Sequence, residues 1–65
     1  MKLEYDPEVD ALYVRFADTS VAETEEVRAG IMLDFDASGR IVAIEALDAS
    51  VHLASGAELT KLAAA

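Results

Sequence analysis

The sequence predicts an α+β fold: a small antiparallel β-sheet of four to five strands, built from hairpins in a meander-like order, with a short C-terminal helix packed on it. Two observations predict this fold. Short segments in which apolar and polar residues alternate are separated by turn residues, which is typical of strands with one wet face. After Ser50 the alternation ends, and a helix-start pattern, Ser55-Gly56-Ala57-Glu58, takes its place. A chain of 65 residues has room for one domain.

The first two strands are expected to form a hairpin. Lys2 to Tyr5 and Ala11 to Phe16 both alternate, and in the second segment Tyr13 and Arg15 point outward. Asp6-Pro7-Glu8 between them is a turn signal, because the proline ring presets φ and the aspartate can bond the backbone ahead of it.

The segment Val21 to Val27 is interpreted as the third strand. Its three glutamates suit an exposed edge, where charge discourages pairing with other chains. Alanine and glutamate also favour helix, but seven residues make a short helix, and Gly30 just before the next apolar run is a turn residue.

The central hairpin spans Gly30 to Ser50 and folds about the turn Asp36-Ala37-Ser38-Gly39, whose aspartate and glycine suit a type I turn followed by a glycine bulge. If Asp36 lies opposite Arg40, then Phe35 lies opposite Ile41. Each preceding residue of the first strand then lies opposite the next residue of the second, which ends with Met32 opposite Ile44. The predicted core face then carries the following residues: Ile31, Leu33, Phe35, Ile41 and Ala43.

On the other face of this hairpin the same register places an apolar strip formed by Met32, Val42, Ile44 and Ala46. A strip of this kind requires cover, either from the C-terminal segment or from a second copy of the chain. Tyrosine and arginine are enriched in protein interfaces. The predicted interface therefore consists of Met32, Val42, Ile44, Ala46, Tyr13 and Arg15.

The C-terminal segment is expected to form a short helix, because Ser55 and Glu58 have the spacing of a capping box. Leu53, Ala57, Leu59 and Leu62 would form its apolar stripe. Residues 61–65, KLAAA, resemble the translation of a cloning polylinker that precedes a purification tag. We therefore expect the native domain to cover residues 1–60.

The net charge of −8 argues against nucleic acid and against an anionic membrane surface as partners, since both are bound through cations. The negative charge favours solubility first, and it also suits a small basic protein or a divalent cation as a partner. Without cysteine, disulfides and thiolate zinc sites are excluded. With no signal peptide and no long apolar run, a cytoplasmic protein is expected.

One stretch matches part of the EF-hand calcium-loop pattern. The matching ligand and turn positions are Asp34, Asp36, Ser38, Gly39 and Glu45. The flanking segments indicate strands, whereas an EF-hand loop lies between helices. In the predicted register Glu45 also lies opposite Ile31 on the core side, too far to close around an ion. No metal and no cofactor is therefore expected.

The remaining polar residues form no convergent catalytic set. His52 is the only histidine, and no serine has a spacing that pairs it with a base and an acid. Glu4, Asp6, Glu8 and Asp10 gather around the first turn, where turn preference and solvation explain them, although such carboxylates could also bind a cation or act as an acid/base pair.

Two motifs, YDPEVDALYVRF (Tyr5 to Phe16) and LDFDASGRIVAIEALDAS (Leu33 to Ser50), together with VAETEEV between them, resemble the small prokaryotic family catalogued as domain of unknown function 2283. Ala43 stands where the family is expected to have glycine. The resemblance implies a small sheet domain and no established activity. Because genes of this family often neighbour small toxin-like reading frames, it also implies an antitoxin-like role.

Two functions are therefore expected. The first is a protein-binding module that forms a homodimer or covers a small basic protein through its sheet. The alternative is a carboxylate- or metal-dependent enzyme that uses Asp34, Asp36 or the carboxylates of the first turn, with its site in a cleft formed by a dimer, because one small sheet has little room for a pocket.

Overall fold

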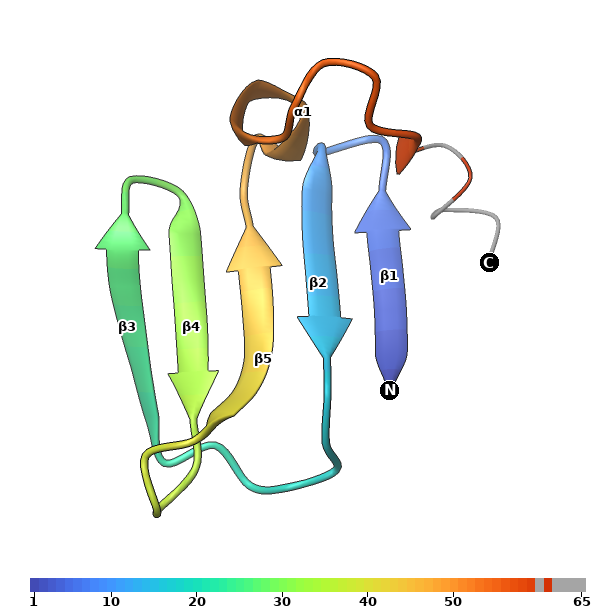
Figure 1. Ribbon diagram of the computed structural model, residues 1–65. Coiled ribbons are helices and arrows are strands. Elements are labelled where there is room, and N and C mark those ends of the chain that lie inside the picture. Colours follow the sequence, from blue (N-terminus) through green and yellow to red (C-terminus); the bar gives the residue numbers. More distant parts are fainter. Residues whose placement is uncertain (60, 62–65) are drawn as a thin grey trace.

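The computed structural model describes residues 1–59 and 61 and shows a five-stranded antiparallel sheet followed by a short helix (Figure 1). The predicted fold class is confirmed. The elements are β1 (Lys2–Asp6), β2 (Ala11–Arg15), β3 (Glu23–Arg28), β4 (Ile31–Phe35), β5 (Ile41–Ala46) and α1 (Ala49–His52).

The strand order is β1-β2-β5-β4-β3, and most connections are hairpins. The one departure from a plain meander is the connection over residues 16–22, which carries the chain from β2 to the far edge of the sheet (Figure 1). β5 then returns between β2 and β4. This central place suits β5, because Val42, Ala43 and Ala46 make it the most buried strand.

The edges of the sheet are β1 and β3. Every residue of β3 is exposed, and its sequence ETEEVR carries three glutamates. The prediction of a charged edge strand in this segment is confirmed. A bulge between Glu26 and Arg28 further distorts this edge, which is another feature that discourages pairing with other chains.

The turn of the central hairpin forms as predicted. The Asp36 amide donates to the Arg40 carbonyl oxygen over 2.9 Å, and the Gly39 amide donates to the Asp36 carbonyl oxygen over 3.0 Å. Gly39 has a φ of 83°, a conformation that glycine adopts without steric cost. Phe35 lies opposite Ile41, also as predicted.

Beyond that pair the predicted register is wrong, because β5 contains a bulge. Asp34 lies opposite Ala43, so Val42 is an extra residue that has no partner of its own on β4. Met32 is consequently opposite Glu45 instead of Ile44. Because side chains alternate along a strand, a slip of one residue moves each later side chain of β5 to the other face relative to β4.

The bulge corrects both predicted faces. Ala43 lies on the same face as Asp34 and is therefore not on the predicted core face with Leu33. Leu33 lies opposite Ile44 instead. The predicted apolar strip is divided as well, because Val42, Ile44 and Ala46 lie on one face and Met32 lies on the other.

The core lies at one end of the sheet, where α1 and the segment after it cover the apolar face (Figure 1). Ala46, Ala49 and Leu59 are its buried members, and partly buried apolar side chains surround them. These are Tyr5, Leu12, Ile31 and Leu53.

The first helix lies N-terminal to the predicted one. α1 begins at Ala49, shortly after β5, and the sequence did not predict it. The predicted capping box holds a turn in which the Ala57 amide donates to the Ala54 carbonyl oxygen over 3.1 Å, but within the predicted helix Leu59 and Lys61 are helical, and the Lys61 amide donates to the Glu58 carbonyl oxygen over 3.1 Å. The rest of that predicted helix reaches residues 60 and 62–65, and these, with most of the predicted vector-derived tail, lie outside the described residues.

Asp10 connects the first hairpin to α1. Its carboxylate accepts hydrogen bonds from the Tyr5 hydroxyl (2.5 Å), the Ser50 hydroxyl (2.5 Å) and the Ser50 amide (3.1 Å). Its carbonyl oxygen accepts one from the Ala49 amide (2.8 Å). The N-cap residue of α1, Asp48, makes no side-chain cap bond, so Asp10 satisfies the first amides of α1 from another part of the chain.

The burial of Val42 makes a first prediction. Val42 is 1% exposed, so Val42→Ala removes two buried methyl groups and leaves a cavity; we expect the free energy of unfolding to fall by about 2 kcal/mol. Urea denaturation at one fixed protein concentration measures the change. Val51→Ala is the control, since Val51 is 78% exposed. Equal effects of the two variants would contradict the packing of the bulge.

The bonds to Asp10 predict a pH dependence. Hydrogen bonds from the Ser50 and Tyr5 side chains lower the pKa of Asp10 below its usual 3.8. The stability that this carboxylate contributes is therefore present above pH 3.8 and is lost as the pH falls through the lowered pKa. Asp10 has a φ of 54°, which asparagine also tolerates, so Asp10→Asn removes the charge without straining the backbone. Thermal melts should then show a smaller acid-induced loss than in the parent chain. An unchanged pH profile would count against this role for Asp10.

Candidate functional site

The two faces of the sheet differ in chemistry, and each is a candidate surface. Cross-strand pairing sorts the side chains, because directly opposed residues share a face. The polar face carries Lys2, Glu4, Tyr13, Arg15, Thr24, Glu26, Met32, Asp34, Ala43 and Glu45. The apolar face carries Leu3, Tyr5, Leu12, Val14, Ile31, Leu33, Ile44 and Ala46.

Asp34 is the most buried charged residue of the polar face, with 6% of its surface exposed. The Thr24 hydroxyl on β3 donates to Asp34 Oδ1 over 2.6 Å. On the β5 side Asp34 flanks Ala43, which is fully buried between Asp34 and Arg15. Asp34 is therefore held in place by neighbouring strands on both sides.

Glu45 lies beside this aspartate, between Tyr13 on β2 and Met32 on β4. Burial raises the pKa of Glu45 above its usual value of 4.5, and the charge of Asp34 and a hydrogen bond with it raise the pKa further. The two carboxyl groups thus form a pair in which Glu45 holds a proton more readily than an ordinary glutamate.

This pair was not predicted from the sequence. The predicted register placed Glu45 opposite Ile31 on the core side, whereas Glu45 lies opposite Met32 on the face of Asp34. The source of this error is the apolar run Ile41-Val42-Ala43-Ile44. Because it interrupts the alternation of apolar and polar residues, it does not indicate on which face of the sheet each side chain lies. For the alternative of an acid/base enzyme, Asp34 and Glu45 supply a carboxyl pair on this face, whereas Asp36 is occupied within its own turn.

Arg15 is the cation nearest to the centre of the polar face. Its Nη1 donates to the Tyr13 hydroxyl over 3.1 Å and its Nη2 donates to the Thr19 carbonyl oxygen over 2.6 Å. The bond to Tyr13 raises the pKa of Arg15. Tyr13 and Arg15, both predicted interface residues, therefore lie together, but on the face opposite to Val42, Ile44 and Ala46.

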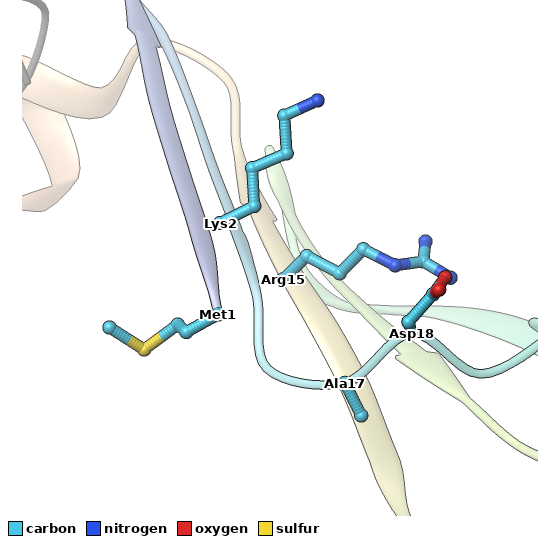
Figure 2. A pocket seen from close by; sticks show the side chains of 5 residues that line it. All are labelled: Met1, Lys2, Arg15, Ala17 and Asp18. Carbon is cyan, nitrogen blue, oxygen red and sulfur yellow. The ribbon is translucent and has the colours of Figure 1, made fainter.

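An open depression of about 200 Å³ lies beside Arg15, at the end of the sheet away from α1. Figure 2 shows the Arg15 side chain extending towards Asp18, while Lys2 points away from both. Met1 and Ala17 complete the lining. Its volume is below the roughly 300 Å³ at which small-molecule sites begin, so the depression is a poor pocket for a substrate.

Among residues 1–59 and 61, no second layer covers most of the apolar face. α1 and the segment after it cover the end that carries Tyr5 and Ile31. In Figure 1 no described segment crosses the rest of the sheet. We call the uncovered part the open apolar face; it consists of Leu3, Val14, Phe16, Leu33, Phe35, Ile41, Val42 and Ile44.

The side chains of the open apolar face shield one another only in part. Val42 is buried beneath its neighbours, whereas Phe16 is 45% exposed and Leu33 and Ile44 are partly exposed. On β3, Glu25 lies opposite Leu33 and Glu23 lies opposite Phe35, so two carboxylates line one margin of this surface. An apolar centre with a charged margin is typical of an interaction surface.

The calcium-loop look-alike is a turn. Asp36 Oδ1 accepts bonds from the amides of Ser38 (2.9 Å) and Arg40 (3.0 Å) and from the Ser38 hydroxyl (2.8 Å). The bond from Arg40, followed by those from Ser38, lowers the pKa of Asp36. Within residues 1–59 and 61, no three His, Cys, Asp or Glu side chains are grouped closely enough to hold a metal ion.

The remaining predicted candidates also have local structural roles. Asp6 accepts a bond from the Glu8 amide over 3.0 Å within the first turn, and Glu4 pairs with Lys2. His52 lies at the end of α1 against Gly30, where an added Cβ would come within 2.9 Å of the imidazole Nε2. Gly30 therefore leaves room for His52 as well as forming the turn.

The chain is thus a single-sheet domain with one polar and one largely uncovered apolar face, and its described part has no helix long and apolar enough to cross a membrane. The chain belongs to the family described as protein of unknown function (DUF2283), whose family model matches residues 2–50. This confirms the resemblance found in the sequence. Searches of curated proteins and of solved structures give no match.

The raised pKa of Glu45 predicts a second pH dependence, of opposite sign to that of Asp10. In the folded chain Glu45 keeps its proton above pH 4.5, where the same glutamate in the unfolded chain loses it. The free energy of unfolding therefore falls as the pH rises through the raised pKa of Glu45. Glu45→Gln removes the charge and keeps a donor for Asp34. We expect this variant to be more stable than the parent chain at pH 7 and equal to it near pH 4 in urea denaturation.

Glu26→Gln is the matched control, because Glu26 lies exposed on the same face. If Glu45→Gln lowers stability at pH 7, or if Glu26→Gln has the same effect, the two carboxyl groups do not interact as described.

Proposed function

We propose that this domain is a self-associating binding module in which the open apolar face packs against the same face of a second copy. The single observation that carries the proposal is that no segment of the described part of the chain lies over most of the apolar face. A sheet is stable in water when its apolar face is buried against another layer. α1 supplies such a layer at one end only.

The dimensions of the sheet support a second sheet as the missing layer. Five-residue strands are about 17 Å long, and five strands spaced about 4.8 Å apart are roughly 24 Å wide. A whole flat face of this size covers about 400 Å² per chain, so two copies bury at most about 800 Å² between them, which is below the roughly 1,200 Å² of standard specific interfaces and in the range of weak, transient contacts. We therefore expect a dimer that dissociates in the micromolar range.

The distribution of charge fits the same arrangement. Two sheets packed face to face bring their apolar side chains together and leave their margins in water. Glu23 and Glu25 stand at such a margin, where water solvates the carboxylates. The polar face, with Asp34 and Glu45, would remain outside the dimer and free for other contacts.

The test compares two variants that introduce the same charge on opposite faces. Ile44→Asp places a carboxylate in the open apolar face, and Met32→Asp places one on the polar face of the neighbouring strand. We expect Ile44→Asp to be monomeric and Met32→Asp to associate like the parent chain. Sedimentation equilibrium from about 1 µM to about 1 mM covers the expected range of dissociation constants.

Circular dichroism of both variants verifies that the sheet remains folded. A parent chain that stays monomeric up to the highest concentration would overturn the proposal and would leave a small basic protein as the candidate occupant of the face. Equal loss of association in both variants would show that the contact does not depend on the apolar face.

A further inference from the structure

The two edges of the sheet differ in their capacity to pair with themselves. A strand at an edge has unpaired backbone groups on its outer side and can pair with the same strand of a second copy. On β3, antiparallel self-pairing centred on Thr24 sets Glu23 against Glu25 in both directions. Pairing centred on Glu25 or on Glu26 sets that glutamate against its own copy. Pairing centred on Val27 would set Glu26 against Arg28, but the bulge between these two residues interrupts the regular edge there. Like charges directly opposed are destabilising.

The edge strand β1, with the sequence KLEYD, behaves differently. When two copies of β1 pair antiparallel about Leu3, Lys2 of each chain lies opposite Glu4 of the other. Leu3 meets Leu3 at the centre, and Met1 meets Tyr5. Every charged pair is attractive and every other pair is apolar or aromatic, so this register is self-complementary.

Neighbouring registers lack this property. Centring the pair on Glu4 opposes two glutamates, and centring it on Tyr5 opposes Glu4 and Asp6 in both directions. The self-complementary register also uses the end of β1 that lies away from α1, which no described segment crosses in Figure 1. Among the registers that use a regular, unbulged edge, charge thus favours one register of β1.

We propose that β1 of this chain pairs with β1 of a second copy, antiparallel and centred on Leu3, and so joins two five-stranded sheets into one continuous sheet. This contact is separate from the face-to-face contact proposed above and goes beyond it. Because opposed residues share a face, the open apolar faces of the two chains would lie on the same side and form one larger apolar surface.

The side chains are already placed for this contact. Lys2 Nζ and Glu4 Oε1 are 3.1 Å apart within one chain, and the two side chains are 66% and 60% exposed. A second β1 in the stated register would add a lysine beside each glutamate and a glutamate beside each lysine. The result is a square of alternating charges on the polar face, and a network of this kind is stronger than an isolated surface pair.

The experiment exchanges these charges. Lys2→Glu and Glu4→Lys each turn both attractive pairs into repulsive ones, so each variant alone should pair through β1 at least about tenfold more weakly than the parent chain. A mixture of the two variants restores attraction in every pair, and the double exchange K2E/E4K restores it within one chain. Native mass spectrometry of single variants, mixture and double variant measures the assemblies directly.

A second salt bridge provides the matched control. Glu58 and Lys61 also lie 3.1 Å apart and are similarly exposed, so a mixture of Glu58→Lys with Lys61→Glu changes net charge in the same way without touching β1. We expect hetero-assemblies in excess of the random proportion only in the mixture of the Lys2 and Glu4 variants. Circular dichroism establishes that all variants are folded.

The outcomes separate this proposal from the preceding one. If the open apolar face also associates, the control mixture gives hetero-dimers in random proportion. The mixture of the Lys2 and Glu4 variants then gives hetero-dimers above that proportion, together with larger assemblies. If that face does not associate, hetero-dimers form in the β1 mixture alone. Identical behaviour of the two mixtures, or a double exchange variant that associates more weakly than the parent chain, would overturn pairing through β1.

Discussion

The bulge in β5 determines which side chains of this domain act together. One extra residue, Val42, moves Glu45 to the side of Asp34 and moves Ile44 to the side of Leu33. Without it, the sheet would have a carboxylate under α1 and apolar residues mixed into both faces. With it, one face is polar and the other is apolar almost throughout. The carboxyl pair and the open apolar face are therefore two results of the same local backbone feature.

The second constraint is size. A chain of 65 residues builds one sheet and has little left for a second layer. The described part of that remainder is used at one end, where Ala49 and Leu59 close the core over Ala46. Asp10 holds this cover to the first hairpin with its carboxylate and its carbonyl oxygen, so the small core depends on a polar connection as well as on apolar burial.

The fold class, the strands and the turn at Asp36 could be predicted, because each depends on local signals such as alternation, an Asp-Pro turn and a glycine with positive φ. Residue Asp36 acts within its turn, as turn chemistry implies. The pairing beyond Phe35 could not be predicted, since an apolar run does not reveal on which face each member lies. The position of α1 was also missed, because its first amides are bonded by Asp10, far away in the sequence. The grouping of Asp34 with Glu45 follows from the register and was lost with it.

The long connection between β2 and β3 also has a consequence for how the chain folds. Strands β1 and β2 form one local hairpin, and β3, β4 and β5 form a second local unit. They meet only where β2 pairs with β5, for example Arg15 with Ala43. All other strand pairs join neighbours in the chain, so this pairing carries the largest cost in loop-closure entropy. Such non-local steps are the ones that slow folding. The sheet should therefore assemble from two preformed halves, with the seam between β2 and β5 closing last.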